Sequence, residues 1–537
     1  MIPKSVKNLA ALAAAGAAAA CAATGPLDEF EVAELVVEAS IADLQQAIAR
    51  GRTSCESVVR AYLDRIKAYD APRGVNAITV LNPRALDRAR EIDAALARGE
   101  TPGPLFCAPM LVKDNFDTAD LPTTGGSIAL KDDLPPDDAF MVRRLREADA
   151  IVLAKTNMAE WAFSPRETIS SSYGRTANAY ALDRTPAGSS GGTASGVAAS
   201  FGVAGMGTDT GNSIRGPSSH LALFGIRSTI GLTSRDGVIP LLFDRDIAGP
   251  MTRTVEDGAR IFNIVAGYDP ADPYTEEGRG RREADYTEFL DRRGLRGARI
   301  GVLRALVDTE DADPQVTALF EQALADLRNA GAEIVDPLEI ANFQAHLDSE
   351  DYFCPRFRHD VYVYMRSRGP GAPFLDVASL LETGQYHPSA EGGLRFFSDG
   401  PLEEPPSEWD PPCPDYAAHP GRQAYKADVI AAMDAAGVDA IIYPSWTNPP
   451  APLETAFEDY KGDNSQLVAP DTGLPAVSVP MGFSYGALPA GLQILGRPYS
   501  EGLLIKLAYA YEQATRHRRP PDGFEPLGRP LQISMND

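Results

Sequence analysis

Residues 187–217 read AGSSGGTASGVAASFGVAGMGTDTGNSIRGP, a run of small residues with a polar loop near each end. The residues between the loops are almost all small or apolar, which predicts a helix over Thr193–Phe201 and a strand after it. One helix and one strand bring the loops side by side, so Ser189 and Ser213 are expected to share a site. Gly and Asn also allow turns that expose consecutive N–H groups, which can bind a developing oxyanion.

The segment APMLVKDN at residues 108–115 places a lysine at the end of an apolar run. Lysine is scarce in this chain, and Lys113 is expected to lie in or beside the core. Burial disfavours the ammonium form and lowers the pKa, which makes a lysine a base at neutral pH. A lysine at the end of a strand can instead extend its ammonium group to solvent, so this position alone leaves both interpretations open.

Helical and strand patterns alternate along the rest of the chain. Apolar residues recur at helical spacing, and short apolar runs between them are typical of strands. The expected helices cover residues 41–68, 138–147, 313–330 and 424–435, and the expected strands cover residues 150–154, 299–303, 332–335 and 440–443. This alternation predicts an α/β fold with a large covered sheet.

Composition limits the class of protein and its partners. The chain has 537 residues, of which 44% are hydrophobic and 23% are charged, and these are the proportions of a globular protein. Its 50 Lys and Arg against 74 Asp and Glu give a net charge of −24 at pH 7. Such a surface repels phosphate backbones and anionic lipids, and the sequence contains no basic patch. We therefore expect no nucleic-acid partner.

Residues 1–20 have the pattern of an export signal. Lys4 and Lys7 precede the apolar run Leu9–Ala20, and small residues follow. At ~1.5 Å per residue such a short run cannot cross ~30 Å of hydrocarbon, so we expect no membrane span. Cys21 follows three alanines, which also resembles a lipoprotein signal with a lipid anchor at Cys21. A buried Ala-rich helix is the alternative, but the pattern favours an exported, periplasmic protein.

Cysteine and histidine spacing predicts neither a metal site nor a cofactor. The four cysteines after Cys21 are too far apart for CxxC patterns, and the six histidines are scattered. We interpret the histidines as ordinary surface or core residues. An oxidising compartment allows one or two disulfides, but the sequence does not select their pairing. The four cysteines are Cys55, Cys107, Cys354 and Cys413.

Residues 350–421 are expected to form an insertion. Residues 399–421 are crowded with Pro and acidic residues, which predicts an extended loop, and residues 352–364 are rich in aromatic side chains. A lid over a site and a surface insertion without a functional role both fit this pattern. Trp161, Phe163 and residues 241–243 are further candidates for a pocket, although such residues more often belong to a core.

The motifs together resemble the amidase signature family, and within it most closely the bacterial peptide amidases. The resemblance rests on residues 112–115 (VKDN), 188–192 (GSSGG), 207–215 (GTDTGNSIR), 225–237, 246–251 and 473–491. It implies the amidase signature fold, a large mixed and twisted β-sheet with helices on both faces. It covers roughly residues 40–520, which we expect to form a catalytic domain that contains the insertion. With the signal expected at 1–20, this leaves a mature N-terminal segment at 21–39 and a tail at 521–537.

The resemblance implies a Ser–Ser–Lys triad without a metal or organic cofactor. Ser213 would be the nucleophile that forms an acyl-enzyme. Ser189 would follow a cis peptide bond and bridge Ser213 to Lys113, the neutral general base. The substrate would be a small-molecule or peptide amide, and the sequence does not select among peptide amides, aryl or other N-acyl amides and aliphatic amides.

The second loop would supply the oxyanion hole through the backbone N–H groups of Thr210, Gly211 and Asn212. Ser190 is expected to steady Lys113 or Ser189, and Asp209 is expected to pair with Arg215 and brace the loop. Relatives commonly have Gly where this chain has Asn212. Asn tolerates left-handed backbone angles, so the hole can survive, and its side chain would narrow the pocket or contact the substrate.

Other functions also fit parts of the pattern. The same triad can hydrolyse esters or carbamates, and a catalytically dead binding protein or an amide-transferring subunit would share the fold. Residues 188–192 also match GxSxG, which suggests an α/β-hydrolase with Ser190 as the nucleophile. That turn needs a hydrophobic strand before it, whereas residues 179–186 (AYALDRTP) are polar and interrupted by Pro.

Overall fold

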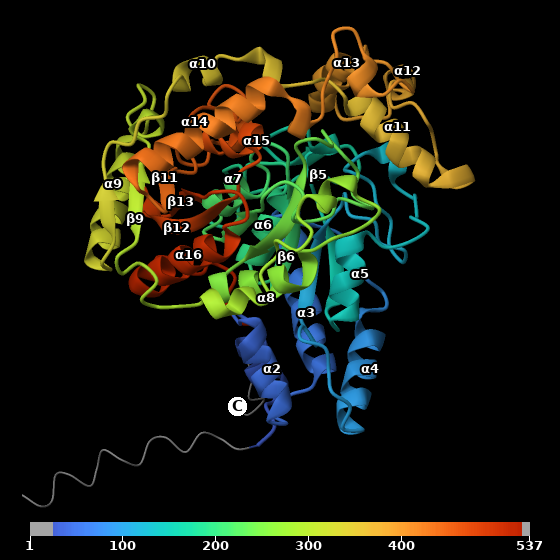
Figure 1. Ribbon diagram of the computed structural model, residues 1–537. Helices are drawn as coiled ribbons and strands as arrows, with labels where there is room; N and C mark the ends of the chain where they lie inside the picture. The colour runs from blue at the N-terminus through green and yellow to red at the C-terminus, as the bar shows by residue number, and fades with distance from the viewer. Residues whose placement is uncertain (1–24, 529–537) are drawn as a thin grey trace, which may run out of the picture.

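An eleven-stranded sheet forms the centre of the computed structural model, which describes residues 25–528 (Figure 1). The strand order is β1-β3-β2-β6-β8-β7-β12-β13-β11-β9-β10. Neighbours are parallel around β2 and around β9 and antiparallel between these two regions, so the sheet is mixed, as predicted. The strands are β1 (Ile78–Leu81), β2 (Pro109–Lys113), β3 (Ile151–Thr156), β6 (Ala204–Asp209), β7 (Phe224–Arg227), β8 (Ile247–Thr252), β9 (Arg299–Val302), β10 (Glu333–Val335), β11 (Ala440–Pro444), β12 (Ala476–Ser484) and β13 (Leu488–Leu495).

Helices cover both faces of the sheet, which confirms the predicted fold class. Helices α8, α9 and α16 pack together against one face, and α6 and α7 pack against the other. Because both faces are covered, every residue of β2 and of β6 is buried. The helices are α1 (Glu29–Leu35), α2 (Ile41–Ala49), α3 (Cys55–Arg73), α4 (Ala85–Ala97), α5 (Phe140–Glu147), α6 (Gly191–Ala198), α7 (Arg215–His220), α8 (Val255–Val265), α9 (Pro314–Asn329), α10 (Phe343–Leu347), α11 (Phe357–Ser367), α12 (Ser379–Thr383), α13 (Glu391–Phe397), α14 (Pro420–Ala436), α15 (Ala469–Thr472) and α16 (Glu501–Thr515).

The helix expected over residues 41–68 is wrong as one element, because the chain forms two helices there, α2 and α3. Gly51 between them has a φ of 66°, which glycine adopts readily. The Ser54 hydroxyl then accepts a hydrogen bond from the backbone N–H of Ser57 and caps α3. Helix α6 spans Gly191–Ala198, so it begins and ends earlier than the expected helix over Thr193–Phe201. The strands expected at 299–303 and 440–443 are β9 and β11.

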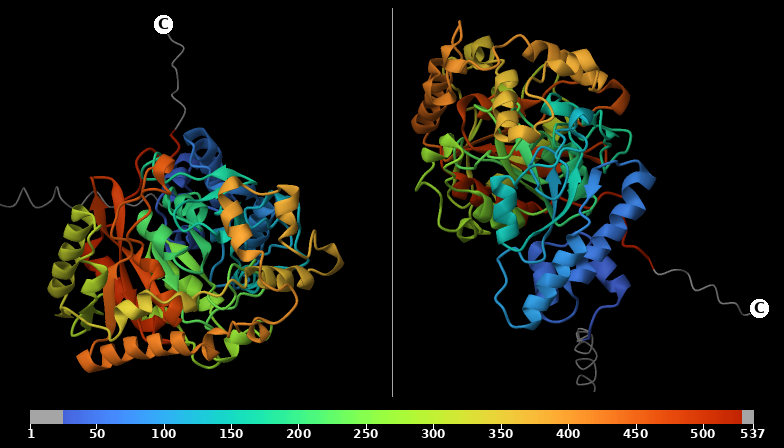
Figure 2. Two further views of the ribbon diagram at one scale, coloured as in Figure 1. Left: turned by 90° about the horizontal axis from the view of Figure 1, so that it is seen from above. Right: turned by 90° about the vertical axis from the view of Figure 1, so that its right-hand side faces the viewer.

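The aromatic segment after residue 350 is largely helical and forms a second core. Helices α11 and α13 pack there with Trp161 and with Leu242. These insertion helices lie at the opposite end of the molecule from α2–α4 (Figures 1 and 2). A disulfide joins Cys354 to Cys413 and encloses most of this segment, and a second disulfide joins Cys55 to Cys107. Residues 399–419 contain only two short 3-10 turns.

The predicted signal at residues 1–20 and the lipid-anchor candidate Cys21 lie outside the described residues. Among residues 25–528, the helices are all too short or too polar to cross a lipid bilayer.

Candidate active site

Two parallel strands place the predicted site at one edge of the sheet. Strands β2 and β6 are neighbours, and Val112 lies opposite Met206 in their register. Both strands therefore end at the same edge, where β2 ends in Lys113 and β6 ends in Asp209. Loops that follow the carboxyl ends of parallel strands form the usual ligand sites of α/β sheets.

Lys113 is fully buried and contacts two hydroxyl groups. Its Nζ lies 2.7 Å from Ser189 Oγ and 2.7 Å from Thr208 Oγ1, and no carboxylate of the described chain is within ion-pair distance of it. Burial lowers the pKa of Lys113 to about 7, although the charges of Asp246 and Asp209 act in the opposite direction. A neutral amine in this position can accept the Ser189 proton while it donates one of its own to Thr208.

Lys155 is a second fully buried lysine, and its surroundings are different. Its Nζ donates to the carbonyl oxygen of Phe116 and to Thr123 Oγ1, both at 2.8 Å, and lies 3.4 Å from Asp114 Oδ1. The acceptors around it require N–H donors, and the carboxylate stabilises positive charge. The surroundings of Lys155 therefore stabilise a cation, whereas in the described chain those of Lys113 offer no carboxylate in contact.

The first loop brings Ser189 to Lys113 through close packing of its backbone. The peptide bond between Gly188 and Ser189 is cis. A Cβ atom at Gly188 would lie 2.4 Å from the carbonyl oxygens of Glu167 and Ser164, so only glycine fits. Ser190 does not hydrogen-bond to Lys113 or Ser189. Its Oγ donates to the carbonyl oxygen of Thr208 at 3.2 Å instead, so any support for Lys113 passes through Thr208.

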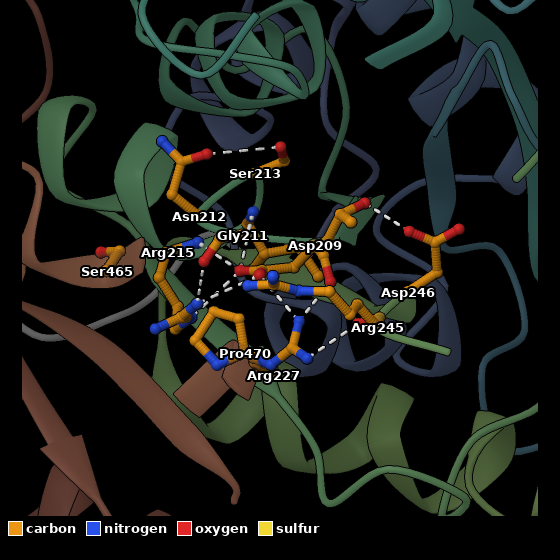
Figure 3. Close-up of polar contacts among 12 residues, drawn as sticks. Asp209, Gly211, Asn212, Ser213, Arg215, Arg227, Arg245, Asp246, Ser465 and Pro470 are labelled. Atoms are coloured by element: carbon orange, nitrogen blue, oxygen red, sulfur yellow. Dashed lines mark hydrogen bonds and ion pairs between the residues drawn. The ribbon is translucent and has the colours of Figure 1, made fainter. Parts of the chain in front are cut away.

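Ser213 lies in the second loop and is nearly buried. Its Oγ donates to Asn212 Oδ1 at 3.5 Å (Figure 3). Within residues 25–528, no hydrogen bond joins Ser213 to Ser189. The two loops nevertheless meet at the Pro165 carbonyl oxygen, which accepts from the Gly188 N–H at 2.8 Å and from Asn212 Nδ2 at 3.2 Å. The direct contact between Ser213 and Ser189 that the predicted triad requires is therefore not formed among the described residues, where the Ser213 hydroxyl is directed to Asn212.

Asp209 fixes the second loop through ion pairs with two buried arginines. Its carboxylate accepts from Arg215 Nε at 3.0 Å and from Arg227 Nη1 at 2.9 Å (Figure 3). Burial alone would raise the pKa of Asp209, but the charges and hydrogen bonds of both arginines bring it down to about 2. The pairing of Asp209 with Arg215 expected from the sequence is thus present, and Arg227 joins it.

The same arginines turn the loop carbonyls away from the site. Arg227 donates to the carbonyl oxygen of Asp209, and Arg215 Nη2 donates to that of Gly211 at 2.6 Å. In the described structure the backbone N–H groups of Thr210, Gly211 and Asn212 donate to no protein acceptor. Three consecutive free N–H groups beside a serine hydroxyl can stabilise an oxyanion.

A family model described as Amidase matches residues 57–365, which is more than half of the chain. The chain belongs to the amidase signature family. The peptide amidase from Stenotrophomonas maltophilia has a similar structure, with a TM-score of 0.79 and 37% identity over 90% of this chain and 98% of that one. A bacterial aryl acylamidase of the amidase signature family follows, with a TM-score of 0.74 and 25% identity over 92% of this chain and 99% of that one.

The similar proteins also include amidotransferase subunits. A glutamyl-tRNA(Gln) amidotransferase subunit from Carboxydothermus hydrogenoformans is 32% identical over 503 residues, which are 90% of this chain and 98% of the relative. The family thus contains both amidases and amidotransferase subunits, and the chain is an enzyme of this amidase signature family.

Asn212, the position where the resemblance led us to expect Gly, is accommodated without a left-handed backbone. It is not among the residues with positive φ in the described chain. Its side chain instead bridges the site, because it donates to the Pro165 carbonyl and accepts from Ser213. The tolerance of Asn for left-handed angles is therefore not the reason that this substitution fits.

A cavity of about 280 Å³ opens beside Ser213. Phe163 and Leu241 line it, as the sequence suggested, and the insertion contributes Phe353 and Phe397. Trp161 does not line the cavity, because it packs against Phe357 in the second core. The full lining is Ala162, Phe163, Pro165, Thr210, Gly211, Asn212, Ser213, Leu241, Arg245, Phe353, Phe397 and Gln466.

Several residues of this amidase signature site were missed in the sequence. Thr208, the second partner of Lys113, and Asp246 both lie inside the recognised motifs and could have been found there. The Asp246 carboxylate accepts from the Thr210 hydroxyl and, at 2.8 Å, from the Leu241 N–H, so it fixes the loop. Arg245 and Gln466 reach the cavity from loops whose sequence carries no signal of that position.

Proposed function

We propose that the chain is an amidase that hydrolyses the C–N bond of linear carboxamides through an acyl-enzyme on Ser213. The observation that carries this proposal is the buried contact of 2.7 Å between Lys113 Nζ and Ser189 Oγ, without a carboxylate on the lysine. With a pKa of about 7, this lysine is neutral in a large share of molecules near pH 7 and can act as a general base. Membership of the amidase signature family supports the same reaction class.

The reaction runs in two steps. Ser213 Oγ attacks the carbonyl carbon while its proton passes to Ser189 and the Ser189 proton passes to Lys113. The N–H groups of residues 210–212 bind the resulting oxyanion, which collapses as Lys113 returns the proton through Ser189 to the leaving amine or ammonia. Water then attacks the acyl-enzyme by the same relay and releases the acid.

The cavity supports an amide with an apolar acyl part. Phe163, Leu241, Phe353 and Phe397 form much of its wall, so burial of an aromatic or aliphatic group there is favourable. The structurally similar proteins named peptide amidase and aryl acylamidase fit a small-molecule or peptide amide. Two of these four residues come from the insertion, which is consistent with a lid role for residues 350–421 of the catalytic domain at 40–520.

A panel of amides and esters tests this proposal. Purified full-length chain is incubated with matched peptide amides, aryl amides, aliphatic amides, esters and carbamates, and release of ammonia, amine and alcohol is measured beside a Ser213→Ala control. Release of ammonia or amine that Ser213→Ala abolishes is the expected result. Hydrolysis of esters alone would replace the proposal with an esterase on the same triad. Failure of the isolated chain on every substrate would favour a subunit that needs a partner.

We also propose that the protein is exported and lies in the periplasm, free or anchored by a lipid at Cys21. The signal-like residues 1–20 support export, and so do the two disulfides, which form in oxidising compartments. Fractionation of bacteria that express the full chain tests this: the protein should appear in the periplasmic or membrane fraction, and Cys21→Ser should release a lipid-anchored form. Retention in the cytoplasm would contradict the proposal.

A further inference from the structure

Among the described residues, Arg245 is the one charged side chain in the lining of the Ser213 cavity. It precedes Asp246 in the loop that leads to β8 (Figure 3). Its side chain is only 8% exposed. Its Nη2 lies 2.9 Å from Asp471 Oδ1, which forms an ion pair. Its guanidinium nevertheless donates no hydrogen bond to any described residue, and Nε is fully buried without a partner.

The neighbouring arginines donate several hydrogen bonds, although Nε of Arg227 is also buried without a partner. Arg227 donates to both a carboxylate oxygen and the carbonyl oxygen of Asp209 and to the carbonyl oxygen of Arg245. Arg422 donates to the Asp244 carboxylate and to the carbonyl oxygens of Asp471 and Pro470. A guanidinium has five N–H donors in a fixed arrangement, and buried donors without acceptors are rare and costly. Arg245 thus forms an ion pair with Asp471 but, unlike Arg227 and Arg422, donates no hydrogen bond to any described residue.

The surroundings of Arg245 within the cavity are mainly apolar. Its Cζ lies 5.7 Å from the centre of the Phe353 ring, and Phe163 and Leu241 belong to the same wall. In such a site a donor forms a strong hydrogen bond, because water competes weakly. Because Arg245 is the one charged residue of this lining within the described chain, an oxygen acceptor on a molecule that occupies the cavity would meet its hydrogen-bond donors.

We propose that Arg245 determines specificity by binding an oxygen acceptor on the acyl part of the substrate. This inference rests on the proposed amidase function. The acceptor is a carboxylate or a neutral carbonyl oxygen, such as the preceding peptide carbonyl of a peptide amide. The acyl part is assigned because it remains bonded to Ser213 in the cavity after the amine has left, whereas Lys113 and Ser189 do not line this cavity. A cationic acyl group is repelled by the guanidinium.

Primary amides isolate the acyl side, because their leaving group is ammonia. Four primary amides of equal chain length, which end in a methyl group, a methyl ketone, a carboxylate or an ammonium group, are compared by ammonia release from the full chain. The ketone, the carboxylate or both should exceed the methyl compound in kcat/KM by about tenfold or more, as expected for a hydrogen bond from a charged donor. The ammonium compound should be the poorest substrate. Whether the ketone or the carboxylate compound is preferred identifies the type of oxygen that Arg245 binds.

Variants separate binding by Arg245 from a structural role. Arg245→Leu should bring the ratio of kcat/KM between acceptor-bearing and methyl-ended amides close to one, and Arg245→Lys should keep part of the preference for carboxylate. Asp471→Asn is the matched control, because it removes the ion pair but leaves the guanidinium, and it should keep the preference. Thermal unfolding of each variant verifies that it is folded.

Three results would overturn the inference: equal kcat/KM for methyl-ended and acceptor-bearing amides in the unmodified chain, a preference that survives Arg245→Leu, or a preference that Asp471→Asn abolishes equally. These results differ from failure of the proposed function, in which the unmodified chain hydrolyses none of the four amides.

Discussion

Lys113 Nζ and Ser189 Oγ lie 2.7 Å apart at the end of β2, and both residues are completely buried. The other contact of Lys113 is also a hydroxyl, Thr208 Oγ1. With no carboxylate against it, the ammonium form has no counter-charge in contact, and desolvation makes the neutral amine accessible near pH 7. The proposed chemistry of the site depends on this protonation state.

We predict that kcat/KM rises with pH through about 7, where Lys113 loses its proton. Asp246 contributes a charge that raises the pKa of Lys113, so Asp246→Asn should move this rise to lower pH, with a lower maximum because its loop contacts weaken. The pH dependence of kcat/KM for one amide in both proteins measures the effect. A rise that moves to higher pH in Asp246→Asn, or activity that is greatest near about pH 4, would contradict Lys113 as the base.

Substitution of each buried lysine by methionine should have opposite effects on the stability of the protein. Lys113→Met should abolish turnover yet preserve or increase the free energy of unfolding near neutral pH. The pKa of Lys113 is about 7 in the folded protein and 10.5 ordinarily, so between these values the unfolded chain binds more protons and stability increases with pH. Below about 7 the lysine is buried with its charge, and methionine removes that cost.

Lys155→Met is the matched control for this prediction. It leaves the Asp114 carboxylate and several carbonyl oxygens without their cation, which should cost about 3 kcal/mol or more. Activity and urea unfolding of both variants provide the measurements. Near-normal turnover in Lys113→Met, or a larger loss of stability there than in Lys155→Met, would count against the assigned roles.

Asn212→Gly should widen the cavity and release Ser213. It removes the acceptor of the Ser213 hydroxyl, which can then turn toward Ser189. It also removes a side chain that lines the cavity. We expect the ratio of kcat/KM between bulky and small acyl amides to increase. Loss of the hydrogen bond to the Pro165 carbonyl should lower stability by about 1 kcal/mol. A ratio that stays constant or decreases would show that Asn212 does not limit the pocket.

The Cys354–Cys413 disulfide should stabilise the insertion that carries Phe397. It joins cysteines 59 positions apart in the sequence, and a loop of this length corresponds to about 4 kcal/mol of chain entropy. The double variant Cys354→Ser/Cys413→Ser should be cleaved faster between these positions in limited proteolysis and lose activity on bulky amides.

The other disulfide provides the control for this experiment. Cys55→Ser/Cys107→Ser should lower overall stability without faster cleavage of the insertion, because this disulfide joins α3 to the segment before β2. Equal cleavage of the insertion in both double variants would exclude a local role for Cys354–Cys413.

The sequence was most informative where partners lie within one motif. The α/β class and the pairing of Asp209 with Arg215 follow from local patterns, because short loops at the ends of β2 and β6 leave their residues few alternatives. The break between α2 and α3 was missed because apolar spacing on both sides is helical and only Gly51 and Ser54 mark the interruption.

Contacts between distant segments could not be predicted in this way. How separate loops pack determines both disulfides and the hydrogen bond from Asn212 to the Pro165 carbonyl. It also determines that Arg245 and Gln466 line the cavity. Ser190 was expected to steady Lys113 or Ser189, but its hydroxyl is bound to the backbone of Thr208, a position that only the register of β6 fixes.

The most direct test of the Ser–Ser–Lys relay is to locate the acyl group during turnover. The full chain is mixed with a slowly hydrolysed amide, and the reaction is quenched in acid and digested. Mass spectrometry then measures the masses of the peptides that contain residues 189–190 and 213. The account predicts an acyl adduct on Ser213 that is absent from Lys113→Ala and Ser213→Ala. An adduct on Ser190, or one that forms at the normal rate without Lys113, would contradict it.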